Sequence, residues 1–197
     1  MEYKFKTEPY AHQLKALGAS HNRENYALFM EMGTGKSKVL VDNIAMLYDK
    51  GKINAALIVA PKGVYRNWER QEIPIHMPDH IVHNVVTWSP ATTKKQEKEN
   101  IKLFKHGEQL TIFLMNIEAF STVKGLDIAK RFMLAHQCLM AIDESTTIKS
   151  PTARRTKNVL KLRNYAKYRR ILTGSPVTKS PLDLYTQCYF LDPYYLD

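Results

Sequence analysis

The amino-acid sequence predicts an α/β fold, with one lobe built on a central, mostly parallel sheet that is flanked by helices. Short apolar runs recur along the chain, and stretches with helical periodicity lie between them, which is typical of parallel strands joined by crossover helices. The chain has 197 residues, of which 44% are hydrophobic and 24% charged. This length and composition are ordinary for one soluble globular domain. We therefore expect a single domain over residues 1–197.

Six short apolar runs are the predicted strands, and each ends near a turn or a polar cluster. Such runs, bounded by turn signals, are consistent with strands that are buried in a parallel sheet. The predicted strands span residues 26–30 (YALFM), 55–60 (AALIVA), 83–87, 111–115 (TIFLM), 138–142 (CLMAI) and 169–172.

The segments between these runs are the predicted helices. In residues 36–50, apolar side chains recur at helical spacing before Gly51, and a glycine at that place is a common helix stop. Residues 91–106 mix charges of both signs, which favours a solvated helix. The remaining predicted helices span residues 64–73, 126–136, 152–162 and 182–190.

A glycine turn joins the first strand to the first long helix and reads EMGTGKS over residues 31–37. Gly33 and Gly35 permit backbone angles at which successive N–H groups face a phosphate, and the following helix adds the positive end of its dipole. The ammonium group of Lys36 would reach the terminal phosphates, and the Ser37 hydroxyl would bind Mg²⁺. The predicted nucleotide-binding residues of the turn are Met32, Gly33, Thr34, Gly35, Lys36 and Ser37.

This turn departs from the general phosphate-loop consensus, G-x-x-x-x-G-K-[S/T], at one position. The consensus has a glycine where this chain has Met30. On these residues alone, a glycine-containing helix cap stays open as the alternative to a nucleotide site.

Two adjacent carboxylates, Asp143 and Glu144, follow the apolar run at 138–142. In a parallel sheet the carboxyl end of that strand faces the same crevice as the glycine turn. Asp143 can there hold Mg²⁺ through water, and Glu144 can orient or deprotonate the water that attacks the terminal phosphate. An Asp-Glu pair alone is more often a solvated turn or a helix cap, so the catalytic prediction depends on the preceding phosphate loop.

Six motifs in this order resemble those of the first RecA-like lobe of superfamily-two helicases, a phosphate-loop NTPase fold. The resemblance is strongest to the Swi/Snf-type branch of double-strand DNA translocases, whose phosphate loop reads E-M-G-x-G-K-[S/T] and therefore explains Met30. The motifs are a Q motif at 9–13, the loop at 31–37, motif Ia at 57–72 with its Asn67-Trp68 pair, a loose motif Ib at 115–118, Asp143-Glu144 in place of the D-E-A-H box, and motif III at 172–176 (LTGSP).

The resemblance implies ATP and Mg²⁺ as cofactors and DNA as partner, in sequence-independent contact with a duplex. It implies that Gln13 reads the adenine edge and that Asp143, together with Ser37, belongs to the metal site. Lys36, Asp143 and Glu144 would be the catalytic residues. The residues implied to contact DNA are Lys62, Arg66, Asn67 and Asn116.

The box around the carboxylates departs from the family pattern, because Ser145 and Thr146 stand in place of Ala-His. This leaves open how hydrolysis is coupled to motif III. Our hypothesis is that the hydroxyl of Thr146 bonds across to Thr173 or Ser175.

The charge balance favours a polyanionic partner. Lysine and arginine number 29 against 19 acidic residues, which gives a formal charge of +10. Residues 149–170 contain nine basic residues and no acidic one; there Arg154, Lys157 and Lys161 fall on one helical face, which either lines a duplex or is solvated. No apolar run is long enough for a membrane span. We expect no membrane partner and an intracellular protein, cytoplasmic if the source is a bacterium or a phage.

The family's motor needs a second RecA-like lobe, which supplies arginine fingers to the transferring phosphoryl group. Only four residues follow Pro193, so we expect that lobe in a longer protein or in a separate chain, and we expect weak hydrolysis from this lobe alone. Two alternatives stay open: a non-catalytic nucleotide- or DNA-binding scaffold that keeps the fold, and a different phosphate-loop enzyme such as a small kinase. The LTGSP segment and the Asn67-Trp68 pair speak against the kinase.

Overall fold

The computed structural model describes residues 3–91, 93–105 and 107–196. Its centre is a six-stranded sheet in the order β1-β6-β5-β2-β4-β3, and every described strand pairing is parallel. The α/β prediction is therefore confirmed, and the sheet is parallel throughout the described residues. The strands are β1 (Asn25–Phe29), β2 (Ala55–Ala60), β3 (His83–Thr87), β4 (Leu110–Asn116), β5 (Cys138–Asp143) and β6 (Ala166–Thr173).

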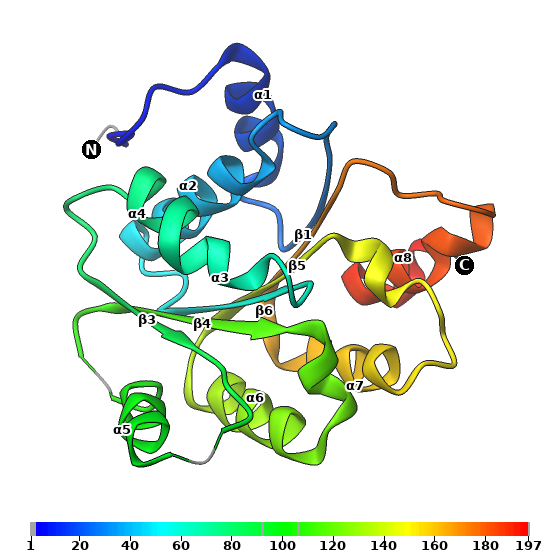
Figure 1. Cartoon of the computed structure of the whole chain (residues 1–197). Coiled ribbons are helices and arrows are strands. Elements are labelled where there is room, and N and C mark those ends of the chain that lie inside the picture. The colour runs from blue at the N-terminus through cyan, green and yellow to red at the C-terminus, as the bar shows by residue number, and fades with distance from the viewer. Residues whose placement is uncertain (1–2, 92, 106, 197) are drawn as a thin grey trace.

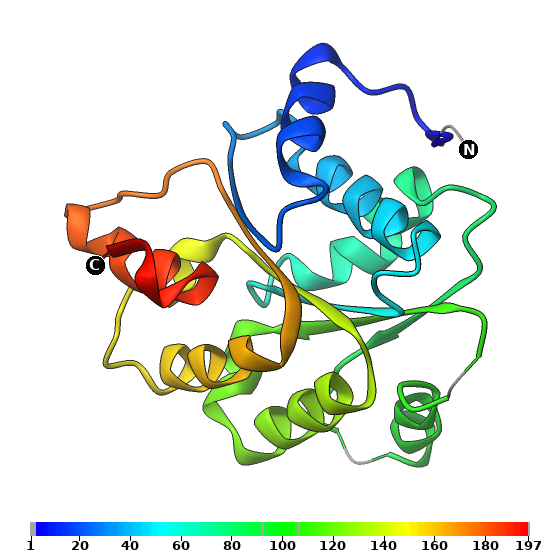
Figure 2. The same ribbon diagram turned by 180° about the vertical axis from the view of Figure 1, so that it is seen from behind.

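Helices cover both faces of this sheet, as Figure 1 and the reverse view in Figure 2 show. On one side lie α1 (Ala11–Ser20), α2 (Lys36–Asp49), α3 (Tyr65–Asn67) and α4 (Ile73–His76). On the other side lie α5 (Lys94–Lys102), α6 (Val123–Ala135) and α7 (Arg154–Leu162), and α8 (Tyr185–Leu191) packs into the same core layer through Phe190 and Leu191.

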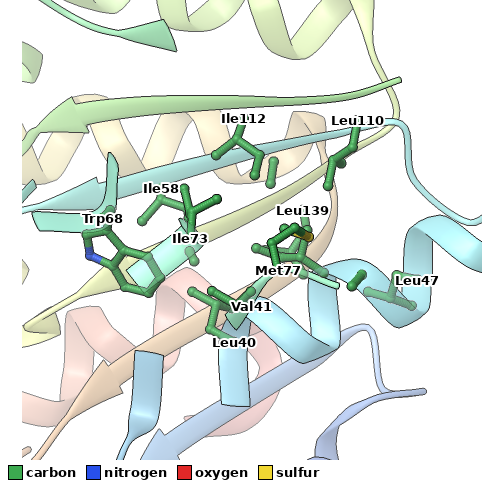
Figure 3. Packing of buried hydrophobic residues seen from close by; sticks show 14 of the residues in the cluster. Leu40, Val41, Leu47, Ile58, Trp68, Ile73, Met77, Leu110, Ile112 and Leu139 are labelled. Carbon is green, nitrogen blue, oxygen red and sulfur yellow. The ribbon is translucent and has the colours of Figure 1, made fainter. Parts of the chain in front are cut away.

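The two core layers follow from the alternation of side chains along the strands. In β2, Ala56 and Ile58 belong to the apolar cluster under α2, whereas Leu57 and Val59 belong to the cluster over α6 and α7. All six residues of β2 are buried because the strand is central and covered on both faces. Figure 3 shows part of the first cluster, in which side chains from α2, α4 and three strands pack together, with the ring of Trp68 at one end.

Each predicted strand is confirmed, with ends shifted by up to three residues. The predicted helix at 64–73 is instead α3, a π-helical turn at Trp68–Glu72 and α4, which continue one another to His76. The predicted helix at 182–190 begins with a short 3₁₀ turn, Pro181–Leu184, ahead of α8. Further 3₁₀ turns are Ile117–Ser121, Ser145–Ile148, Arg163–Tyr165 and Pro193–Leu196.

The sequence analysis did not predict α1, and its residues explain why. The helix has a weak amphipathic pattern, and only Gln13, Leu17 and Ser20 are buried along it. Its first turn is held by a capping box, in which the side-chain oxygen of Gln13 accepts a hydrogen bond from the backbone N–H of Tyr10 at 3.0 Å. No helix among the described residues is long and apolar enough to cross a membrane.

Candidate nucleotide site

Because all strands run in one direction, the segments that follow β1, β5 and β6 leave the sheet at the same edge. β1 leads into the glycine turn, β5 ends at Asp143, and β6 ends at Thr173. In an open parallel sheet, the crevice beyond the carboxyl ends of the strands is the usual ligand site. The predicted site residues of these three segments therefore meet at one edge.

The glycine turn has the backbone that its sequence predicts. Gly33 and Gly35 have φ angles of 74° and 80°, in the left-handed region that favours glycine. Gly35 is the N-cap of the 14-residue helix α2, so the free N–H groups of the first helical turn point into the loop. The ammonium group of Lys36 lies back on the loop, where it donates to the carbonyl oxygen of Glu31 at 3.3 Å.

The side chain of Gln13 forms a hydrogen bond with the backbone of this loop. Its amide nitrogen donates to the carbonyl oxygen of Thr34 at 3.0 Å, and a ring nitrogen of His12 lies 2.9 Å from the same oxygen. A Cβ atom at Gly35 would lie 2.2 Å from the Gln13 nitrogen, so glycine is also needed there for this close approach. Both polar ends of the Gln13 amide are thus engaged within the protein, and adenine recognition by this residue stays a prediction.

Motif III packs directly on the glycine turn. A Cβ atom at Gly174 would lie 3.2 Å from the backbone nitrogen of Met32, and the N–H of Met30 donates to the carbonyl oxygen of Thr173 at 3.3 Å. The sheet pairing of β1 with β6 produces this contact. The two motifs are about 140 residues apart in the sequence and share one wall of the site.

The carboxylate of Asp143 is buried and held at both oxygens. Its Oδ2 accepts a hydrogen bond from the indole N–H of Trp68 at 3.0 Å, and its Oδ1 accepts one from the backbone N–H of Glu144 at 3.0 Å. Burial raises the pKa of Asp143; the two hydrogen bonds and the charge of Lys36 oppose that rise. Glu144, the next residue, lines one cavity with Glu31 and Met32 of the glycine turn, so the phosphate loop and the carboxylate pair share one site.

Glu144 has φ 50° and ψ 61° and is the one non-glycine residue with positive φ among those described. Such a conformation costs about 1–2 kcal/mol outside glycine and is concentrated at functional sites. Glu144 lines a cavity of about 380 Å³ together with residues of motif III and the glycine turn. That lining includes Met32, Thr146, Thr173 and Ser175, all of them predicted site residues.

Glu72 is a third acidic residue at this edge, and the sequence analysis gave it no role beyond the motif. Burial, followed by the negative charge of Asp143, raises the pKa of Glu72, whereas a hydrogen bond with Ser37 opposes the rise. Glu72 therefore lies within reach of both predicted metal residues. The π-helical turn Trp68–Glu72 brings it there together with Trp68.

The hypothesised bond from Thr146 to motif III is not formed by the described side chains, although Thr146 lies in the same cavity as Thr173 and Ser175. Thr173 instead accepts a hydrogen bond from the backbone N–H of Ser175 at 3.1 Å. Ser145, the residue before Thr146, is instead connected to motif III through the side chain of Gln187. Its hydroxyl donates to Gln187 Oε1 at 2.6 Å, and Gln187 Nε2 donates to the carbonyl oxygen of Pro176 at 2.9 Å.

The predicted DNA contacts divide into two groups. Lys62, on the turn after β2, and Arg66 and Asn67, on the short helix α3 that follows, are exposed. Asn116, in contrast, is 6% exposed, and its side-chain oxygen accepts the backbone N–H of Ala119 at 2.9 Å as a helix cap. Contact between Asn116 and DNA stays a prediction without geometric support.

The basic stretch at 149–170 is not one surface. Arg163 and Arg170 are buried, and Arg169 is half-buried. Their guanidinium groups donate to carbonyl oxygens of neighbouring segments, as Arg163 does to Phe190 at 3.0 Å. These three arginines therefore make contacts within the fold and do not form an exposed basic face. The exposed members on α7 are Arg154, Lys157 and Lys161.

Comparison with protein families gives one matching family model, described as the SNF2-related domain, over residues 12–197. Curated relatives include the chromatin-remodeling ATPase INO80 of Aspergillus terreus, 29% identical over 88% of this chain, and the helicase SWR1 of Cryptococcus neoformans, 30% identical over 87%. The chain spans only 10% and 13% of those two proteins.

Among solved structures, the chain is similar to the SWI2/SNF2 ATPase core of Sulfolobus solfataricus in complex with double-stranded DNA. The TM-score is 0.75 and the sequence identity is 22%, over 98% of this chain and 38% of that chain. The core domain of the same organism without DNA gives a TM-score of 0.66. At this level of identity the likeness is one of fold.

Proposed function

The chain belongs to the SNF2-related domain family, and from this premise we propose that it is the ATP-binding lobe of a DNA-dependent ATPase motor. Joined to a second RecA-like lobe, it would couple ATP hydrolysis to translocation on duplex DNA or to its remodelling. The observation that carries the proposal is the meeting of the glycine turn with Asp143 and Glu144 at one edge of the sheet, where Glu31, Met32 and Glu144 line one cavity.

The residues at this edge fit a nucleotide with Mg²⁺. The Ser37 hydroxyl and the carboxylates of Asp143 and Glu72 offer oxygen ligands, the type that Mg²⁺ prefers, and the left-handed glycines leave backbone N–H groups free for phosphate. Mg²⁺, when bound, would neutralise charge on the terminal phosphates. Ser37 and Asp143 would hold it, directly or through water.

The chain's own groups then have separate tasks. Lys36 would leave the Glu31 carbonyl and bind the terminal phosphates, where its positive charge stabilises the transferring phosphoryl group. Glu144, which lines the cavity beside motif III, would orient the attacking water and accept its proton. The left-handed backbone conformation of Glu144 determines the direction in which its side chain points.

The second lobe and the DNA are further parts of the proposal. A trans-acting arginine finger supplies roughly 10³ to 10⁵ in turnover, so this lobe alone would bind ATP far better than it hydrolyses it. Lys62, Arg66 and Asn67 would contact the phosphate backbone, since they are exposed on the turn and short helix that follow β2 at the same sheet edge. Such contact gives no sequence preference.

The first test is equilibrium binding of a fluorescent ATP analogue with Mg²⁺. We expect Lys36→Ala to lower the affinity by about tenfold or more, because it removes the cation that faces the terminal phosphates. Lys52→Ala is the matched control, since Lys52 is exposed and lies beyond the far end of α2; its affinity should equal that of the unmodified chain.

Equal affinities of Lys36→Ala and the unmodified chain would contradict the proposed site. A non-catalytic DNA-binding scaffold that has kept the fold but no longer binds nucleotide is the competing function that this test distinguishes. It predicts that neither protein binds the analogue, including after the second lobe of a related motor is added in trans.

A further inference from the structure

Trp68 connects the apolar core to the proposed metal site. It is 1% exposed, and its ring packs among aliphatic side chains of the core, with Ile58, Ile73 and Leu40 nearby (Figure 3). The ring nitrogen lies on the side away from those side chains and donates to Asp143 Oδ2 at 3.0 Å, across 75 residues of sequence. A buried indole N–H needs an acceptor, and here that acceptor is the carboxylate of the proposed metal ligand.

The same carboxylate holds the next residue in its unusual conformation. Asp143 Oδ1 accepts the backbone N–H of Glu144, whose φ of 50° lies in the left-handed region. With Oδ2 fixed by Trp68, the carboxylate plane cannot rotate without breaking one of the two bonds. The two hydrogen bonds thus connect the indole of Trp68, through the carboxylate of Asp143, to the backbone of Glu144.

The backbone at Trp68 suits this contact. Residues Trp68–Glu72 form a π-helical turn between α3 and α4, and such turns occur frequently at functional sites. The wide turn directs Trp68 at Asp143 and brings Glu72 beside Ser37 and Asp143. An ordinary core tryptophan would need neither a π-turn nor a carboxylate partner.

We propose that Trp68 is a positioning residue of the metal site: its indole N–H orients the carboxylate of Asp143 toward Mg²⁺ and, through Asp143 Oδ1, keeps Glu144 in its left-handed turn. A carboxylate offers about four lone-pair directions, of which two are used by Trp68 and Glu144. The others remain for Mg²⁺ or its waters. The inference rests on the proposed function, because it assigns Asp143 to a metal that accompanies ATP.

The test measures how strongly Mg²⁺ promotes binding of the fluorescent ATP analogue. The variant Trp68→Phe keeps most of the apolar ring and loses the indole N–H. The Mg²⁺ concentration that gives half of the maximal increase in analogue binding should therefore rise about tenfold or more, as for other groups that orient metal ligands. Affinity in EDTA should not change. Trp88→Phe is the matched control: Trp88 is also buried, at 6% exposure, but packs in the other core layer, and neither quantity should change.

A second measurement needs no variant at position 68. The chain has two tryptophans, so a ¹⁵N spectrum contains two indole signals, and Trp88→Phe identifies them. The Trp68 signal should shift when Mg²⁺ is added to the nucleotide-bound chain and should not shift on the same addition to Asp143→Asn, in which the metal ligand is lost.

The outcomes separate the inference from the proposed function. If the unmodified chain binds the analogue neither with Mg²⁺ nor without it, both the proposed function and the role of Trp68 are overturned. Normal Mg²⁺-dependent binding by the unmodified chain, with the same Mg²⁺ dependence in folded Trp68→Phe or an unmoved Trp68 signal, overturns the role of Trp68 alone. A purely structural tryptophan would change the thermal unfolding temperature and leave the Mg²⁺ dependence as it is.

Discussion

Arg170 is a buried cation for which the structure gives no carboxylate partner among the described residues. Its guanidinium donates to the side chain of Asn43 at 2.9 Å and to backbone carbonyl oxygens, among them those of Ser20, Arg23 and Glu24 at 2.7 to 3.0 Å. Burial lowers the pKa of Arg170 to about 10, which still leaves it charged at neutral pH. The cation therefore binds the carboxyl end of α1 and the turn into β1, where the helix dipole is negative.

Arg170→Met should destabilise the fold by about 3 kcal/mol or more, because several buried carbonyl oxygens lose their donor at once. The midpoint of urea unfolding, followed by circular dichroism, measures this change. Arg154→Met, at an exposed position on α7, is the control and should change the free energy of unfolding by less than about 0.5 kcal/mol. A loss below about 1 kcal/mol for Arg170→Met would contradict this role.

Two helical glycines have different surroundings and test packing between elements. Gly125, in the first turn of α6, has no room for a side chain, since a Cβ atom there would lie 2.3 Å from the carbonyl oxygen of Ala119. This glycine lets α6 follow closely on the preceding 3₁₀ turn, Ile117–Ser121. Gly18, in α1, has nothing within 4 Å of such an atom.

The two substitutions by alanine should therefore have opposite signs. Gly18→Ala should stabilise the fold by about 0.5–1 kcal/mol, which is the usual gain in a helix interior. Gly125→Ala should destabilise it, because a backbone carbonyl must move. Thermal unfolding of the two variants measures both changes. Stabilisation by Gly125→Ala would contradict the prediction, because it would mean that the 3₁₀ turn shifts at little cost in free energy.

The formal charge of the whole molecule, +10, is an unreliable guide to its binding face. Three arginines of the basic stretch donate to carbonyl oxygens within the fold, so they add little to the exposed charge that would meet a duplex. Each phosphate contact releases counterions and makes the salt dependence of binding steeper.

Lys62→Ala should weaken binding to duplex DNA of any sequence and lower the slope of log affinity against log salt by about one. The control Lys95→Ala, at an exposed position on α5 beside the edge strand β3, should leave the slope unchanged. Fluorescence anisotropy of a labelled duplex over a series of salt concentrations gives the slopes. An equal reduction by both variants would mean that only the overall charge matters.

The sequence by itself determined the alternating elements, the parallel sheet and the family. Apolar periodicity is local, and the glycine turn needs backbone angles that few residues other than glycine adopt, so both features can be recognised from neighbouring residues. The positions of Gly33, Gly35 and Asp143 follow from such local rules, and the fold places them at the carboxyl edge of the sheet as predicted.

Only the tertiary structure decided which side chains meet across the chain. The bond from Trp68 to Asp143, the Ser145–Gln187 pair and the inward turn of Arg170 join residues 75, 42 and up to 150 positions apart. These contacts depend on the strand order, in which β6 lies between β1 and β5, and β2 lies on the other side of β5. A single polar side chain carries no local sign of its partner, because burial and pairing are settled only when distant elements pack.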